Sequence, residues 1–184
     1  MIENLLIVAG IDDKNHFEPF IQDCLEKGIN TKLHIFGWQD RATPLVAHER
    51  RWLAEVDEFA ALEGRLAVLG ISAGGCEAVY ALQQRPGAID LAINACGALQ
   101  YPYSSHFNWL SGSDSTHFDA ALQKLKPSAE TDEKLVSIGT LYDGLVRRSA
   151  IRFGNSRLTR TVVPGHPLAI NHVLKTMFPD LLAA

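Results

Sequence analysis

The sequence predicts a single α/β domain of three layers, with about six mostly parallel strands and helices on both faces of the sheet. Short apolar runs alternate with segments of helical periodicity along the chain, which is typical of repeated βα units. Several of these runs are continuously apolar, as expected for strands that helices cover on both sides. A length of 184 residues fits one domain spanning residues 1–184.

The first strand is predicted at residues 5–9, where the sequence reads Leu-Leu-Ile-Val-Ala. Further strands are predicted at 31–36, 65–71, 88–95, 135–142 and 157–163. Helices are predicted at 17–25, 45–62, 74–85, 118–126 and 168–178, with an irregular basic helix near 147–152. Such strand–helix alternation favours right-handed crossovers and a parallel sheet. The stretch 98–127 is less regular, and we expect a short lid or an irregular insertion there.

Composition excludes several classes of function. The net charge is −4 and the isoelectric point about 5.9, so no basic footprint for nucleic acid is present. The N-terminal apolar run is too short for a signal peptide or a membrane span. Three widely spaced cysteines favour reduced thiols, and we therefore expect a cytoplasmic protein. The seven histidines lack metal-ligand spacing, so we expect no metal and no organic cofactor.

Three polar residues follow predicted strands, and they are of complementary chemical types. Ser72 is the centre of Gly-Ile-Ser-Ala-Gly at 70–74, which matches the Gly-x-Ser-x-Gly nucleophile elbow between a strand and a helix. Asp143 follows the fifth strand and His166 follows the sixth. Ligands of open parallel sheets bind beyond the carboxyl ends of the strands. A serine nucleophile needs a histidine base, and that imidazole needs a carboxylate to orient it.

On these residues the chain resembles the α/β-hydrolase superfamily, and in size and layout its small bacterial lipases and esterases without a cap domain. The likeness extends from Ile-Val-Ala-Gly-Ile at 7–11, through the elbow, to Asp-Gly-Leu-Val at 143–146 and the Gly-His pair at 165–166. It implies that Ser72 is the nucleophile, Asp143 the acid and His166 the base. It also implies that the backbone N–H groups of Ile11 and Ala73 bind the oxyanion.

The resemblance implies hydrolysis of a carboxylic ester through an acyl-serine intermediate, on a small-molecule acyl ester or thioester. Two alternatives stay open. The same three residues serve acyl-thioesterases and lysophospholipases, and a fold does not choose among them. The protein could instead be a catalytically weak binding module with a hydrolase fold, because Asp12 and Asp13 bring negative charge toward the expected oxyanion. The sequence indicates no oligomeric state.

Other residues are weaker candidates. Asp114 and Asp119 follow no convincing strand, and His172 lies about two turns inside the last helix. Cys76 is expected to be a buried thiol that packs against the sheet. The remaining histidines are expected to be surface or packing residues: His16, His34, His48, His106 and His117. Arginines at 147, 148, 152, 157 and 160 favour a solvated basic face over a site for an anionic substrate.

Overall fold

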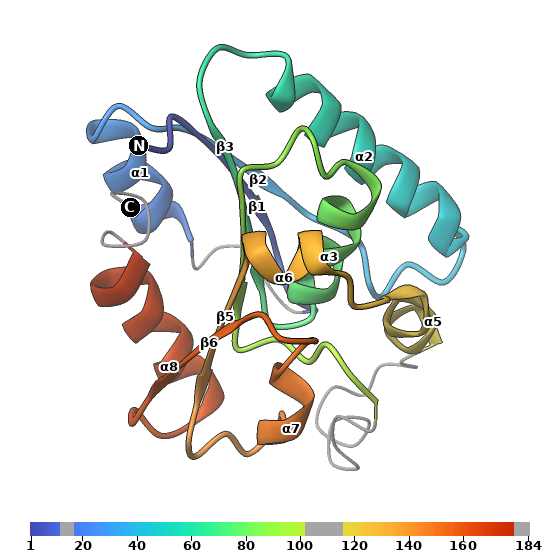
Figure 1. The fold of residues 1–184 in the computed structure, drawn as a ribbon, viewed down its shortest axis with the longest axis vertical. Helices are drawn as coiled ribbons and strands as arrows, with labels where there is room; N and C mark the ends of the chain where they lie inside the picture. The colour runs from blue at the N-terminus through green and yellow to red at the C-terminus, as the bar shows by residue number, and fades with distance from the viewer. Residues whose placement is uncertain (12–16, 102–115, 179–184) are drawn as a thin grey trace.

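The computed structural model describes residues 1–11, 17–101 and 116–178. They form a six-stranded sheet in which every pairing is parallel, in the order β2-β1-β3-β4-β5-β6 (Figure 1). The strands are β1 Asn4–Val8, β2 Asn30–His34, β3 Leu66–Ile71, β4 Leu91–Ala95, β5 Leu135–Thr140 and β6 Arg157–Thr161. The predicted fold class is confirmed, and the sheet is entirely rather than mostly parallel.

The described helices are α1 Glu18–Glu26, α2 Leu45–Ala60, α3 Gly74–Gln84, α5 Thr116–Lys124, α6 Ala129–Lys134, α7 Arg148–Ile151 and α8 His166–His172. A π-helical turn, η1 Val173–Met177, continues α8. The sequence pattern did not predict α6, because this short helix is polar and buries only Thr131. Its start is marked instead by a side-chain cap, in which Ser128 Oγ accepts from the Thr131 N–H.

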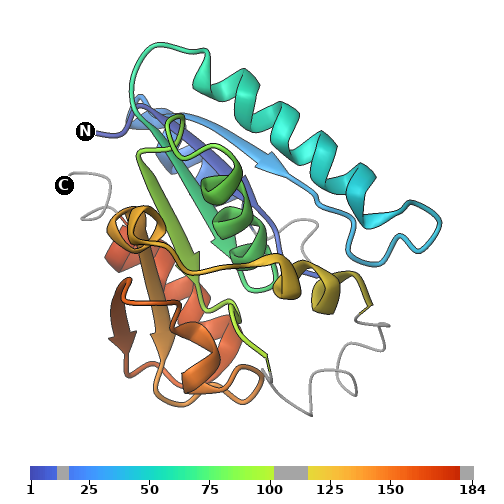
Figure 2. The same cartoon turned by 45° about the vertical axis from the view of Figure 1, so that its right-hand side comes forward.

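Helices cover both faces of the sheet (Figures 1 and 2). One apolar cluster joins α2, α3, α5 and α7 to strand residues such as Val68. A second cluster joins α1 and α8 to residues such as Leu69 on the opposite face. Consecutive strand residues thus enter different cores, which explains why the inner strands β1 and β3 are buried along their whole length, whereas the edge strands β2 and β6 are partly exposed.

The last helix begins earlier than expected. The sequence predicted a tight loop at 164–167 followed by a helix from Leu168, whereas α8 starts at His166. Gly165 has a φ of 82°, a left-handed conformation that favours glycine, and Pro167 lies within the first turn, where its missing N–H costs nothing. His166 is therefore held at a helix start, not in a loop.

Two expectations concern residues outside those described. The acidic pair Asp12 and Asp13 is outside them, and so is the 102–115 part of the expected lid. The flanking parts of that segment pack into the core, where Leu99 and Phe118 are both buried. Across the described residues, no helix has the length and apolarity that a bilayer crossing requires.

Candidate active site

Ser72 lies in a sharp turn between β3 and α3. Its φ of 53° places it in the left-handed region, which residues other than glycine rarely adopt. Two backbone bonds hold this conformation: Ser72 N–H donates to Ala95 O, and Gly75 N–H donates to Ser72 O, each at 2.9 Å. Strained backbone of this kind is concentrated at functional sites. The predicted elbow conformation is present.

The glycines on either side of Ser72 are required by close backbone contacts. A Cβ on Gly70 would lie 2.3 Å from Gly74 O. A Cβ on Gly74 would lie 2.2 Å from Val8 O and 2.8 Å from Ala9 O. The elbow is therefore packed directly onto the end of β1, and any larger residue at either position would force the backbone apart.

Asp143 follows β5 and is held by its own loop. Its side chain is 1% exposed, and its Oδ1 accepts from the backbone N–H groups of Leu145 at 2.8 Å and Val146 at 3.0 Å. Burial raises the pKa of this carboxyl, but the hydrogen bond and charge of His166 and the two backbone donors outweigh it. The pKa of Asp143 is therefore below its ordinary value, and the group is ionised at neutral pH.

His166 connects the other two residues. Its Nδ1 lies 2.8 Å from Asp143 Oδ2, and its Nε2 lies 2.8 Å from Ser72 Oγ. An ionised carboxylate only accepts, so Nδ1 carries the proton and donates to Asp143. With this proton on Nδ1, the neutral form of the ring has an acceptor at Nε2, to which the Ser72 hydroxyl can donate. The structure brings together three side chains that the sequence separates by up to 94 positions.

The two predicted oxyanion donors belong to neighbouring turns. Ala73 directly follows Ser72, and Ile11 follows β1, which pairs with β3. Ala73 belongs to the apolar cluster of the face that α2 and α3 cover, and the partly buried Ile11 packs against the same cluster. The turn after β1 is anchored by Trp38, whose Nε1–H donates to Ala9 O at 3.2 Å. These positions are compatible with the predicted pair of donors, whose role stays a prediction.

Solved structures share this arrangement of strands and helices. A monoacylglycerol lipase from Paleococcus ferrophilus matches with a TM-score of 0.69 at 10% identity, over 99% of this chain and 95% of that one. A methylesterase from Arabidopsis matches with a TM-score of 0.67 at 16% identity, over 99% and 98%. Est1E from Butyrivibrio proteoclasticus matches with a TM-score of 0.65 at 14% identity, over 99% and 86%. The chain has the α/β-hydrolase fold. No protein-family model matches the sequence, and neither does any curated protein.

Within this α/β-hydrolase fold, the other acidic and histidine residues considered as site candidates are not part of the Ser72–His166–Asp143 cluster. His172 hydrogen-bonds with Thr176 on the last helix, and Asp119 belongs to α5. His34 and His48 are buried packing residues, and His117 is half-buried beside the carbonyls of residues 40 and 43. Asp114, His16 and His106 lie outside the described residues.

The three cysteines are buried and unpaired. Cys76 donates its thiol to Ala73 O at 3.1 Å, as expected for a packing residue. Burial, with the nearby charges of Glu77 and Glu49, raises the pKa of this thiol well above its ordinary value. Burial and the charge of Asp143 raise the pKa of Cys96 to about 12. Neither thiol forms a nucleophilic thiolate near neutral pH.

Sequence reasoning missed Asn94. The segment 88–95 is predicted as a strand from its apolar residues alone, yet it contains this fully buried amide, directly beside the elbow. The available signal was a polar residue in the interior of a buried strand, since buried polar groups need specific partners.

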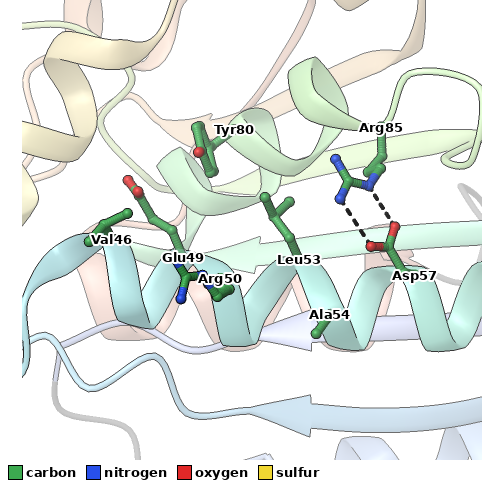
Figure 3. Close-up of a pocket in the computed structure, with 8 residues that line it drawn as sticks. All are labelled: Val46, Glu49, Arg50, Leu53, Ala54, Asp57, Tyr80 and Arg85. Carbon is green, nitrogen blue, oxygen red and sulfur yellow. Dashed lines mark hydrogen bonds and ion pairs between the residues drawn. The ribbon is translucent and has the colours of Figure 1, made fainter.

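A surface pocket of about 330 Å³ lies between α2 and α3 (Figure 3). The ion pair of Arg85 Nε with Asp57 Oδ1, at 2.6 Å, closes one side, while Glu49 and Tyr80 lie toward the other (Figure 3). None of its lining residues is a predicted site residue: they are Val46, Glu49, Arg50, Leu53, Ala54, Asp57, Tyr80 and Arg85.

Proposed function

We propose that the protein is a serine hydrolase that cleaves a carboxylic ester through an acyl-serine intermediate. The observation that carries the proposal is the hydrogen-bonded chain from Ser72 Oγ through His166 to Asp143, with 2.8 Å at each step. A serine in this setting can lose its proton as it attacks, because the neutral Nε2 is already its acceptor. The lipase and esterase activities named for the structural neighbours agree with this chemistry.

Acylation begins when Ser72 Oγ attacks the ester carbonyl carbon and its proton moves to His166 Nε2. The resulting oxyanion accepts from the N–H groups of Ala73 and Ile11, a contribution of about 3–4 kcal/mol per donor. Collapse breaks the carbon–oxygen bond of the leaving group, which takes the proton from Nε2. The buried Asp143 carboxylate stabilises the imidazolium throughout this step.

Deacylation repeats these steps with water as the nucleophile. His166 Nε2 accepts a proton from the attacking water, and the acyl group leaves as a carboxylic acid, which restores the Ser72 hydroxyl. No group other than the substrate and water is needed to balance these steps. The same chemistry applies to an acyl-thioester, with a thiol as leaving group, or to a lysophospholipid.

A fluorophosphonate probe tests the nucleophile directly. We expect covalent labelling at Ser72 and hydrolysis of a p-nitrophenyl ester, with both lost in Ser72→Ala. Ser137→Ala is the matched control, because Ser137 is a fully buried serine in β5 without a hydrogen-bond partner among the described residues. Labelling or turnover that persists in Ser72→Ala would overturn the proposal, and a wild-type protein inert to both reagents would favour a binding module.

A second experiment addresses substrate class and place of binding. Esters and acyl-thioesters of matched chain length, together with a lysophospholipid, separate the three candidate activities by kcat/KM. Arg50→Ala alters the pocket between α2 and α3 without touching the proposed site. We expect unchanged kcat/KM in this variant, because the ester is proposed to bind at Ser72.

A further inference from the structure

A turn at the end of β4 packs against the proposed nucleophile. Asn94 is fully buried, and its side chain makes two hydrogen bonds to the backbone of Gly97. Nδ2 donates to Gly97 O and Oδ1 accepts from Gly97 N–H, each at 3.0 Å. Between these residues Cys96 has a φ of 58°, so the amide closes a turn that is itself strained.

The turn formed by residues 94–97 packs tightly against the elbow at Ser72. A Cβ on Gly97 would lie 2.2 Å from Ser72 O, and a Cβ on Gly75 would lie 2.0 Å from Asn94 Oδ1. The Ser72 N–H also donates to Ala95 O, the residue after Asn94. The elbow is therefore held both by the strand that contains Asn94 and by the turn that Asn94 closes.

We infer that Asn94 is a positioning residue, which keeps Ser72 in its left-handed conformation by fixing Gly97 against the Ser72 carbonyl. The inference rests on the proposed function, because positioning matters for catalysis only if Ser72 is the nucleophile. Asn94 touches no substrate in this role and acts through the backbone alone. A left-handed serine is about 1–3 kcal/mol less favourable than an ordinary conformation, so it persists only where its surroundings enforce it.

Removing the amide would release the turn. In Asn94→Ala both Gly97 backbone groups lose their partners, and Ser72 can relax toward an ordinary φ. A displacement of about 1 Å from a reacting group can cost about 100-fold in rate. We therefore expect kcat to fall about 100-fold with little change in KM, and fluorophosphonate labelling to slow by a similar factor.

Asn94→Asp provides a conservative comparison. A protonated carboxylic acid can donate to Gly97 O and accept from Gly97 N–H, whereas its carboxylate cannot donate. We expect the ratio of variant to wild-type kcat to rise as the pH is lowered. Ser137→Ala is again the control, because Ser137 pairs with Asn94 in the neighbouring strand and is equally buried. It should retain wild-type kcat.

Kinetics of folded variants and a crystal structure of Asn94→Ala decide the question together. A variant that melts lower but turns over at the wild-type kcat would show a merely structural role and overturn the inference. Should the wild type neither hydrolyse esters nor bind the probe, the proposed function fails instead. The crystal structure then tests the positioning itself: a Ser72 φ that stays near 53° without the amide would overturn it.

Discussion

The Gly165 N–H donates to Tyr142 O at 3.0 Å, and this bond joins the two loops that present His166 and Asp143. Thr140 strengthens the junction, because its hydroxyl donates to Val163 O and accepts from Tyr142 N–H. The proposed acid and base thus belong to one hydrogen-bonded unit beyond the ends of β5 and β6. Their separation is set by the backbone as well as by side-chain rotamers.

Thr140→Val should loosen this junction while conserving the side-chain shape. Val163 O and Tyr142 N–H lose a partner in a partly buried position, which should lower the free energy of unfolding by about 1 kcal/mol. We expect kcat to fall with KM nearly unchanged, because only the alignment of acid and base is disturbed. Urea denaturation and steady-state kinetics measure the two effects. Thr159→Val, at a half-buried position in β6, is the control, and equal behaviour of both variants would contradict the prediction.

Asp143→Asn should remove turnover without unfolding the protein. The amide oxygen can still accept from the N–H groups of Leu145 and Val146. Its NH₂ would face His166 Nδ1, which must then accept and carry its proton on Nε2, so Ser72 loses its base. By analogy with serine proteases, kcat should fall about 10⁴-fold. Asp57→Asn, on the surface, is the control, and a fall in kcat of less than tenfold for Asp143→Asn would count against the assigned acid.

The same variant should change the pH dependence of stability. The pKa of Asp143 is depressed in the folded protein, so its stabilising contribution is present above the ordinary value of 3.8 and is lost as pH falls through the folded value. The difference in unfolding free energy between wild type and Asp143→Asn should therefore shrink on acidification. Urea denaturation at pH 6 and at successively lower pH measures it, and a constant difference would contradict this linkage.

Gly70→Ala should disrupt the elbow. The added Cβ would lie 2.3 Å from Gly74 O and 2.6 Å from Gly75 Cα, both of them backbone atoms. We expect a loss of at least about 3 kcal/mol in unfolding free energy, together with loss of probe labelling. Gly87→Ala is the matched control, because a Cβ there meets nothing within 4 Å. Wild-type stability and labelling in Gly70→Ala would show that the elbow can rearrange.

Glu77→Gln should stabilise the protein increasingly as pH rises. Glu77 is fully buried in α3, and neither carboxylate oxygen has a hydrogen-bond partner among the described residues. Burial and the charge of Glu49 raise its pKa well above the ordinary value of 4.5, although Lys124 opposes this shift. A raised carboxyl pKa favours the protonated folded state, so wild-type stability falls as pH rises from about 4.5 through the folded value.

The glutamine variant lacks this loss of stability, and its advantage over wild type should grow between pH 4.5 and pH 8. Thermal denaturation across that range measures the difference. Glu133→Gln, at an exposed position in α6, should show no such trend. A stability difference between Glu77→Gln and wild type that stays constant with pH would mean that Glu77 does not cause the predicted pH dependence.

The sequence by itself determined the order of the strands along the chain and the three residues that follow β3, β5 and β6. Apolar runs and turn residues are local signals: Ser72 directly follows an apolar strand, Asp143 precedes Gly144, and His166 follows Gly165. Ser72, Asp143 and His166 can therefore be recognised from their neighbours in the chain, without any contact between them. The polar helix α6 is not predicted from the sequence, because it has almost no apolar face to produce a periodic pattern.

Only the tertiary structure decided which residues from distant segments of the chain contact one another. Three kinds of contact join residues from different strands or loops. They are the 2.8 Å hydrogen bonds of His166, the hydrogen bond between Gly165 and Tyr142, and the packing of Gly97 on Ser72. Asn94 was hidden for the same reason, since its two hydrogen bonds gain meaning only once β4 lies beside β3. Parallel pairing aligns the carboxyl ends of the strands, and this alignment brings the residues that follow separate strands together in one candidate site.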